Sequence, residues 1–243
     1  MLFLKKKRFK PLYKQLLKLR ENVQNRKRLL TFKKKKWEKL QDFYKRKLKR
    51  YRKFKPQDQN RYLVSKYPSK GTSYQKKHRN TLLASKRFRL FYGGLSQSYL
   101  KNQVRLALSK RGTNKQNTKT DLLFLEIFES RLDTVLYRSK FNVSMRGAQQ
   151  FIAHGKVRVN YRTVQRKTFK LTPGDLITID PNYSSLIEKN VIESPAWPIP
   201  PKHLTINYKT MQILFGDIKN TNISTAFSFN LNLEKILVNY LRH

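Results

Sequence analysis

The sequence predicts an α+β protein in which two helices pack on a small, strongly twisted antiparallel sheet, behind a long Lys-rich helical extension. Three observations predict this class. Apolar residues recur at helical spacing over 121–140 and 144–154, they alternate over 157–160 and 176–179, and lysines fill most positions between the apolar residues of 1–55. Hydrophobic residues make up 38% of the chain, which is enough for a core over part of its length.

The charge of the chain is strongly positive and unevenly spread. The 243 residues include 55 Lys and Arg against 14 Asp and Glu, a formal net charge of +41. Residues 1–100 hold 33 basic and 4 acidic residues, whereas residues 101–243 hold 22 and 10. A free globular protein with this charge repels itself, so the composition indicates a polyanionic partner, either nucleic acid or an anionic membrane.

Composition also excludes several kinds of site. The chain has no cysteine, which rules out disulfides and thiolate metal sites, and its four histidines are scattered. No apolar run approaches the roughly 20 residues of a membrane span. We therefore predict no cofactor, no metal and no membrane span. The N-terminus is too short in apolar residues for a secretory signal and too poor in serine for a typical transit peptide, which leaves a cleaved presequence as the less favoured alternative.

Residues 1–55 are predicted to form a basic helix, because leucine and valine recur at helical spacing among the lysines. A solvated run of charge is the alternative. The positive charge surrounds the helix, which argues against a membrane-surface helix and favours a segment that orders on RNA. Residues 56–80 carry Pro56, Pro68 and Gly71 among polar residues and are predicted to be a linker.

The next segments are predicted to be helical. Residues 81–111 form two helices broken at Gly93-Gly94, and residues 112–120 form a second linker. Residues 121–140 give the clearest helix, with Arg131 and Arg138 seven positions apart beside its apolar face.

A short helix and a strand then form a compact unit. Ser144 is a suitable N-cap for a helix through His154, and Gly155 suits the C′ position. The core face of this helix carries Met145, Ala148, Phe151 and Ile152, and the opposite face carries Arg146, Gln150 and His154. In the strand Val157–Asn160 the valines face one way and Lys156, Arg158 and Asn160 the other.

The remaining elements follow from turn signals. Tyr161-Arg162 is predicted to be a turn, and a second turn at 171–175 precedes the alternating strand 176–179. Beyond residue 180 the chain is polar, with candidate strands at Leu204–Asn207 and Ile213–Phe215. The end of the chain, 231–241, predicts a closing helix.

A rigid scaffold that holds cations at fixed spacing suits double-stranded RNA, which displays its phosphates and 2′-hydroxyl groups and hides its bases. Arginine forks and helix amides are appropriate donors for phosphates. His154 has an alternative role, a favourable interaction with the helix C-terminus. The predicted RNA-binding residues are Lys86, Arg87, Arg89, Arg131, Arg138, Lys140, Arg146, Gln150, His154, Lys156, Arg158, Asn160 and Arg162.

Three segments together resemble the RNA-binding domain named after small-subunit ribosomal protein four. They are RLDTVLYRSKF at 131–141, the run from Ser144 through AQQFIAHGKVRVN at 148–160, and LTPGDLITI at 171–179. RLFYGGLS at 89–96 resembles the segment that precedes this domain in the ribosomal protein itself. The tail that begins HLTINYKTMQILFGDI at residue 203 resembles the C-terminal part of its mitochondrial versions.

The resemblance implies a layout and a function. A helical first domain would comprise residues 56–120 and 183–243, with the RNA-binding domain of residues 121–182 inserted in it and the extension 1–55 in front. The protein would be a structural, non-enzymatic constituent of the small subunit of a mitochondrial ribosome, or alternatively of a chloroplast ribosome. It would bind the 5′ domain of small-subunit rRNA early in assembly. It would lie near the mRNA entry channel, beside neighbouring proteins that include small-subunit ribosomal protein five.

Other functions of the same domain fit less well. An RNA-modifying enzyme, such as a pseudouridine synthase, needs a large catalytic domain after this unit, and too little chain follows. A free RNA chaperone or ribosome-rescue factor lacks both the 89–96 segment and the tail. We expect Asp133 to pair with a nearby arginine, not to act in catalysis, and we expect Phe91 and Tyr92 in the core. The family usually has glycine where this chain has Tyr161, so the turn is a departure from its pattern.

Overall fold

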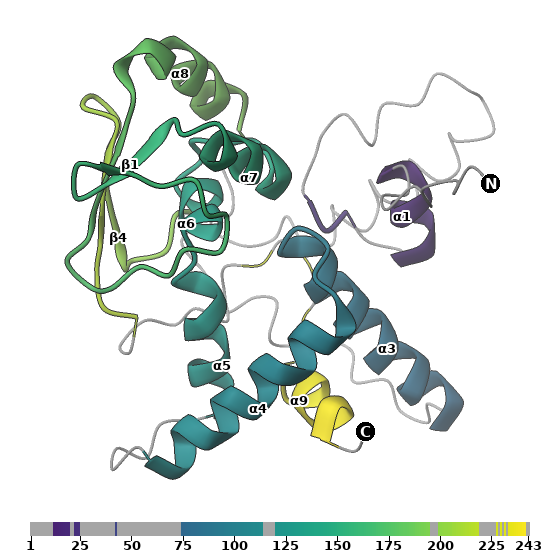
Figure 1. Ribbon diagram of the computed structural model, residues 1–243. Helices are drawn as coiled ribbons and strands as arrows, with labels where there is room; N and C mark the ends of the chain where they lie inside the picture. Colours follow the sequence, from purple (N-terminus) through teal and green to yellow (C-terminus); the bar gives the residue numbers. More distant parts are fainter. Residues whose placement is uncertain are drawn as a thin grey trace, which may run out of the picture.

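The computed structural model consists of two parts (Figure 1). The α/β unit contains the sheet and helices α6, α7 and α8, and the helical part contains α1, α3, α4, α5 and α9. The α+β class is confirmed for the residues that the structure describes. Those residues are 12–19, 22–24, 42, 74–113, 120–194, 199–218, 227, 229, 231 and 233–241. Most of the predicted basic helix of residues 1–55 lies outside them. No helix in these ranges is long and apolar enough to cross a membrane.

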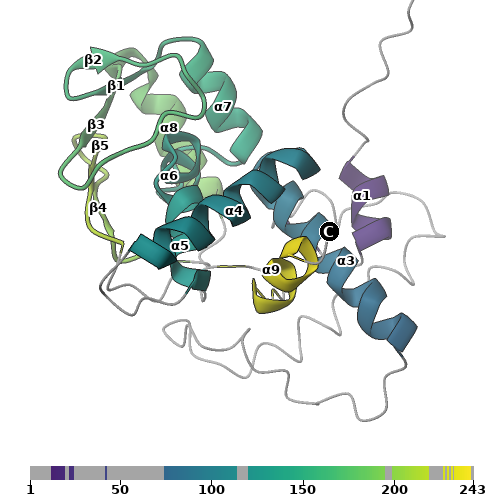
Figure 2. The ribbon, with the colours of Figure 1, turned by 60° about the horizontal axis from the view of Figure 1, so that its bottom comes forward.

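The helical part brings together segments that are far apart in the sequence. In Figures 1 and 2 the last helix lies beside helices from the first half of the chain, and α1 contacts α3. Helices α3 and α4 meet at the predicted Gly93-Gly94 break and α9 ends at Leu241 as predicted, but α3 starts seven residues before residue 81 and α5 ends well before residue 140. The bounds are α1 Leu12–Leu19, α3 Tyr74–Phe91, α4 Gln97–Thr113, α5 Thr120–Glu129 and α9 Leu233–Leu241.

The predicted linker over 56–80 is therefore wrong from Tyr74 onward. Tyr74, His78 and Arg79 are exposed in the first turns of α3, so this part of the helix has no apolar stripe that periodicity could reveal. The predicted linker 112–120 is also too long at both ends, since Thr113 closes α4 and Thr120 opens α5, and its middle lies outside the described residues.

The predicted break at Gly93-Gly94 is confirmed. Both glycines have positive φ, 83° and 84°, and the Gly94 N–H donates to the Arg89 carbonyl at 2.8 Å. A Cβ atom on Gly93 would lie 2.6 Å from the Gln149 Nε2 atom. Glycine thus serves twice here, because it allows the left-handed backbone and the close approach of a side chain from another helix.

The single helix predicted over 121–140 is wrong. It is divided into α5 and α6 (Leu132–Arg138), with Arg131 as the N-cap of α6 in an extended conformation. Two backbone hydrogen bonds to the segment around Lys170 stabilise this break. The Leu132 N–H donates to the Phe169 carbonyl at 3.0 Å, and the Leu171 N–H donates to the Ser130 carbonyl at 2.8 Å. Because this partner segment is distant in sequence, helical spacing alone could not reveal the break.

The sheet of the α/β unit has five antiparallel strands in the order β2-β1-β3-β5-β4. Helices α6, α7 and α8 lie on one side of it in both ribbon views (Figures 1 and 2). The bounds are α7 Met145–Ala153, β1 Val157–Val159, β2 Arg162–Thr163, β3 Leu176–Ile179, α8 Ser184–Glu193, β4 Leu204–Asn207 and β5 Gln212–Phe215.

Both late strands were predicted correctly but were assigned to the wrong domain. The boundary at residue 182 is contradicted by β5, which pairs with β3 through Leu176–Leu214 and Ile177–Ile213 and so extends the same sheet. Helix α8 was missed because Ile187 is its one fully buried residue, which leaves no repeating apolar stripe.

A continuous apolar core joins the helical part to the α/β unit. Phe88 packs against Phe124 and Phe128 at ring-centroid distances of 5.3 and 5.1 Å. Phe91 and Tyr92 are 3% and 0% exposed, which confirms that they belong to the core. The buried face of α9 carries Leu233, Ile236, Leu237 and Tyr240, as predicted for the closing helix.

Candidate nucleic-acid interface

Helix α7 has the ends that the sequence predicted. The Ser144 hydroxyl accepts a hydrogen bond from the Gly147 N–H at 3.1 Å, which satisfies one of the free donors of the first turn. At the other end His154 is the C-cap and Gly155 has a φ of 69°. Gln150 and His154 are exposed, and Arg146 is half-exposed, so α7 presents the predicted polar face.

The β1–β2 hairpin turns one residue earlier than predicted. Its two loop residues are Asn160 and Tyr161, with φ of 48° and 66°, and Arg162 already belongs to β2. Two residues with positive φ between paired strands are the mark of a type I′ turn, whose twist matches that of the strands. Asparagine tolerates this region, whereas for tyrosine it costs about 1–2 kcal/mol. The departure noted at Tyr161 is therefore a strained turn residue.

Asn160 holds this turn to the next strand. Its side-chain amide donates to Asp175 Oδ1 at 2.8 Å and accepts from the Leu176 N–H at 3.0 Å. Asp175 also receives the Thr172 N–H at 2.7 Å, so the 171–175 turn and the hairpin are locked together. Asn160 thus has a structural role, and its exposed side chain stays a predicted RNA contact.

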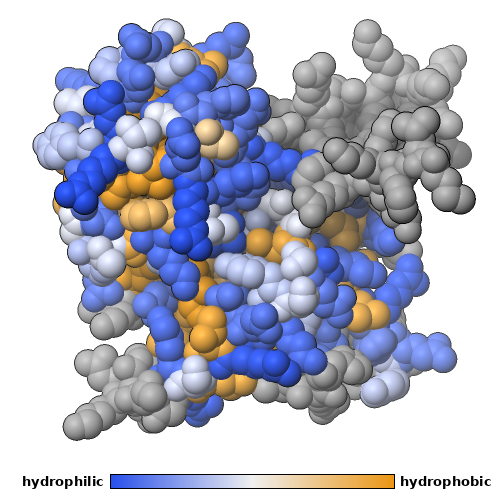
Figure 3. Space-filling model, viewed as in Figure 1, coloured by the Kyte–Doolittle hydropathy of each residue, from blue (hydrophilic) through white to orange (hydrophobic). Residues whose placement is uncertain are grey.

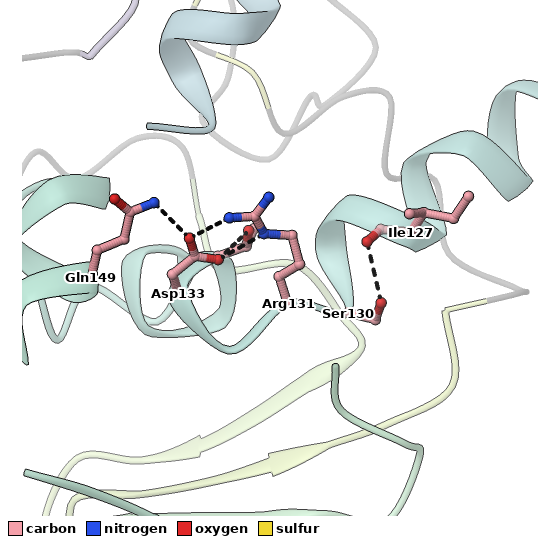
Figure 4. A network of polar contacts seen from close by, with 6 residues as sticks. Ile127, Ser130, Arg131, Asp133 and Gln149 are labelled. Atoms are coloured by element: carbon pink, nitrogen blue, oxygen red, sulfur yellow. Dashed lines mark hydrogen bonds and ion pairs between the residues drawn. The ribbon is translucent and has the colours of Figure 1, made fainter. Parts of the chain in front are cut away.

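Arg131 is buried, and its prediction as an RNA contact is wrong. Its guanidinium pairs with Asp133 at 2.6 Å (Nη2 to Oδ2) and 3.0 Å (Nε to Oδ1), and both side chains are at most 2% exposed. Figure 4 shows Gln149 of α7 directed at the same carboxylate, to which its amide donates at 2.8 Å. Burial lowers the pKa of Arg131, but the Asp133 carboxylate outweighs it and raises that pKa overall. The structural role predicted for Asp133 is confirmed.

Arg138 is buried in a second network and is also excluded from the interface. It pairs with Glu129 at 2.6 Å, and the Tyr92 hydroxyl donates to the same carboxylate oxygen at 2.6 Å. The guanidinium lies 4.9 Å from the ring centroids of both Phe91 and Phe227. Burial opposes ionisation of Glu129, yet Arg138 lowers the pKa of that carboxyl below its usual value. The pair is charged and fully desolvated.

Three of the predicted RNA-binding residues lie in α3, and they too divide into side chains with a protein partner and side chains exposed to solvent. Arg87 donates to the Leu19 carbonyl at 2.8 and 3.1 Å, which docks α1 on α3. Arg89 donates to the Leu95 carbonyl at 2.7 Å and braces the turn after α3. Lys86 is exposed. Only Lys86 of this group presents its charge fully to solvent.

Lys140 and Lys156 are intermediate cases. Lys140 has a φ of 68° just after α6, and partial burial lowers its pKa. The Lys156 ammonium lies 3.8 Å from the Tyr183 ring centroid and 5.6 Å from that of Phe151, so its charge is held beside two aromatic rings. Both side chains are half-exposed.

The remaining cations, Arg158 and Arg162, lie on opposite faces of the sheet. By strand register Arg158 stands between Thr163 and Thr178, on the face of the sheet away from the helices. Arg162 stands opposite Val159, on the face that carries the helices. Both arginines are exposed, so they flank the hairpin on its two sides.

Sequence reasoning missed three exposed cations in the segment between β2 and β3. These are Arg166, Lys167 and Lys170. The signal was present, because residues 154–170 contain six Lys and Arg and no Asp or Glu. In the view of Figure 3 hydrophilic residues cover much of the described part of the chain, with hydrophobic residues exposed between them. Among the described residues no three His, Cys, Asp or Glu side chains gather as metal ligands.

Comparison with known proteins finds a matching family model and relatives of this chain. A family model described as the S4 domain matches residues 130–177. Over 153 residues the chain is 31% identical to "Small ribosomal subunit protein uS4c" of Aethionema cordifolium, which covers 60% of this chain and 73% of that protein. The protein of the same name from Arabidopsis thaliana is 30% identical with the same coverage. "Small ribosomal subunit protein uS4" of Gloeobacter violaceus is 36% identical over 116 residues, 48% of this chain and 55% of that protein.

Proposed function

The chain belongs to the family of small ribosomal subunit protein uS4, and on that premise we propose that it is a structural component of a mitochondrial small ribosomal subunit. It binds small-subunit rRNA through phosphate and shape contacts and catalyses no reaction. The observation that carries this proposal is the separation of charge within the α/β unit. Glu129 and Asp133 form buried ion pairs with Arg138 and Arg131, whereas residues 154–170 contain six Lys and Arg and no Asp or Glu.

The geometry suits a ligand of repeating negative charge. The hairpin is tied to β3 by the sheet and by the Asn160–Asp175 hydrogen bond. The segment that follows is held by backbone hydrogen bonds from the Val164 N–H to the Val157 carbonyl at 3.1 Å and from the Leu132 N–H to the Phe169 carbonyl at 3.0 Å, so the backbone that carries these cations is fixed. Rigid donors lose little conformational entropy when they meet phosphates, and each neutralised phosphate adds to the salt dependence of binding. Lys86 on α3 is an additional candidate contact.

The finer assignments rest on the family. We propose that the rRNA site is in the 5′ domain and is occupied early in assembly. The neighbours would be small-subunit ribosomal protein five and mRNA at its entry channel. We also propose that the α/β unit, extended to include β4 and β5, is inserted in the helical part. The contact of α9 with α3 and α4 supports this layout.

The mitochondrial location is supported by the resemblance of the tail from residue 203 and by the Lys- and Asn-rich composition. The chloroplast is the alternative, since relatives named uS4c belong to chloroplasts. Fractionation of cells that express a tagged chain separates the two. Recovery in mitochondria supports our assignment, and recovery in plastids would replace it.

The binding function is tested with purified full-length chain. We expect it to bind a transcript of the small-subunit rRNA 5′ domain with an affinity that falls steeply as salt rises, and to co-sediment with small subunits through a moderate salt wash. A transcript of unrelated, fully paired sequence is the control for non-specific attraction by the basic extension. Equal affinity for both RNAs at physiological salt would contradict a specific rRNA-binding role.

A further inference from the structure

We propose that Tyr161 is a stacking platform for an unpaired nucleobase of the RNA ligand. The inference rests on the proposed RNA-binding function and adds a ligand class to one residue. Tyr161 is 79% exposed at the tip of the β1–β2 hairpin. This hairpin forms the edge of the sheet that is far from α3, α4 and α9 (Figure 2). In the free protein the ring therefore buries almost no surface.

The backbone makes the presence of tyrosine at this position informative. Tyr161 has a φ of 66°, a region that glycine enters freely and that tyrosine adopts only with strain. Asn-Gly is the preferred pair for this type of turn, and Asn160 already supplies its first half. A glycine would thus suit the fold better, and the tyrosine gains no packing in exchange. Strained residues of this kind gather where proteins bind ligands.

Hydrogen bonds of the preceding residue hold the backbone of Tyr161 in place. Asn160 is tied by three hydrogen bonds to Leu176 of β3 and to Asp175, the residue before it. Its N–H donates to Leu176 O at 2.9 Å, its side-chain amide donates to Asp175, and its side-chain oxygen accepts from the Leu176 N–H. The turn therefore has one position relative to the sheet. A platform that is already in place loses little entropy when a base stacks on it.

The surroundings favour a nucleic acid over a protein partner. Exposed Arg158 and Arg162 flank the turn on the two faces of the sheet, within reach of phosphates on either side of a stacked base. Tyr161 is the one exposed large hydrophobic side chain of the hairpin and of the 164–170 segment, all of whose residues the structure describes. Protein docking surfaces bury a patch of apolar residues, whereas base stacking needs a single aromatic face.

The structure of RNA restricts which base can be bound. Inside a paired helix both faces of a base are covered by its neighbours, and the deep groove excludes side chains. A ring at the tip of a hairpin can meet a base in a bulge, a loop or a junction. The expected ligand is thus an unpaired base beside a helix whose phosphates contact Arg158 and Arg162.

The test compares the full-length chain with Tyr161→Gly, Tyr161→Phe and Tyr161→Leu for binding to the rRNA 5′-domain transcript. Tyr161→Gly should leave the thermal midpoint unchanged or raise it, because it relieves the turn, and should weaken binding about 5- to 150-fold. Tyr161→Phe keeps the aromatic face and should stay within about twofold of wild type. Tyr161→Leu should lose most of the affinity. The salt slope should not change in any of them, because no charge is removed.

The outcomes distinguish this inference from the function on which it rests. Wild-type protein without salt-dependent binding would overturn both. Wild-type protein that binds, with Tyr161→Gly binding equally well, overturns the platform alone. Tyr161→Gly that is normal on naked RNA and fails only in the assembled subunit assigns the ring to a protein neighbour and also overturns it. If Tyr161→Gly failed to fold, the Phe and Leu variants would decide, since equal loss in both excludes stacking.

Discussion

Two pairs of arginines in the same small unit differ in their burial and in their partners. Arg131 and Arg138, at the ends of α6, are at most 5% exposed and are each matched to a carboxylate. Arg158 and Arg162, on the β1–β2 hairpin, are exposed and lie in a segment without acidic residues. The first pair fixes the shape of the unit, and we propose that the second offers charge to an RNA ligand. The comparison shows that the partner of an arginine determines its role more than its place in a motif.

The largest difference between the two pairs should be in stability. Arg138→Met leaves Glu129 as a buried, uncompensated charge and should lower the free energy of unfolding by about 3–5 kcal/mol. Arg158→Met is the matched control and should change it by less than about 0.5 kcal/mol. Urea unfolding at neutral pH measures both. Similar losses in the two variants would show that the hairpin arginine is structural as well.

The next largest effect concerns the hydrogen bond from Gln149 of α7 to Asp133, the carboxylate that pairs with Arg131. Gly93→Ala would place a Cβ 2.6 Å from Gln149 Nε2 and so displace its hydrogen bond to Asp133. Gly174→Ala has a similarly positive φ, 97°, with nothing within 4 Å of the new atom. We expect both variants to be strained and Gly93→Ala to be less stable by about a further 1.5 kcal/mol. Equal unfolding midpoints would mean that Gln149 moves without loss.

The exposed pair should matter for RNA and not for folding. Arg158→Glu combined with Arg162→Glu should reduce the slope of log affinity against log salt by about two and leave the unfolding midpoint unchanged. The control is Lys202→Glu with Lys209→Glu, the same change of charge on exposed residues that flank β4 at the opposite edge of the sheet. If both pairs lower the slope equally, overall charge and not the hairpin controls binding.

The smallest expected effect contrasts a buried with an exposed histidine. Burial lowers the pKa of His203 below 6.5, outweighing the opposing attraction of Glu129, and Arg138 adds to the lowering. The unfolded chain therefore binds a proton before the folded one does. The stability that His203 contributes is complete above pH 6.5 and is lost as pH falls through its depressed folded pKa.

The measurement is urea unfolding at pH 7.5 and at pH 5.5. His203→Phe should reduce the drop in stability between the two values, and His154→Gln, on the exposed end of α7, should leave the drop as it is. A drop that is unchanged in His203→Phe would assign it to other groups.

Local signals in the sequence predicted local structure well. The cap at Ser144, the glycine at Gly155, the break at Gly93-Gly94 and the closing helix all depend on residues within a few positions of one another, and all are confirmed. The turn at Asn160 was displaced by one residue because the family's glycine is replaced by Tyr161, which removes the usual marker of the second loop position.

Long-range structure could not be predicted in the same way. The break at Arg131 depends on the segment around Lys170, and the assignment of β5 depends on its pairing with β3. The predicted RNA contacts at Arg131 and Arg138 were wrong for the same reason. A charged residue beside an apolar stripe looks alike whether it meets a phosphate or a buried carboxylate, and only the packing of Glu129 against Arg138 decides between the two.

The account is tested most directly by a density map of the small ribosomal subunit that contains this chain. It predicts rRNA phosphates in contact with Arg158 and Arg162, an unpaired base on the ring of Tyr161, and no nucleotide at Arg131 or Arg138. A map in which the hairpin and the 164–170 segment face solvent or another protein, with rRNA on some other surface of the chain, would contradict it.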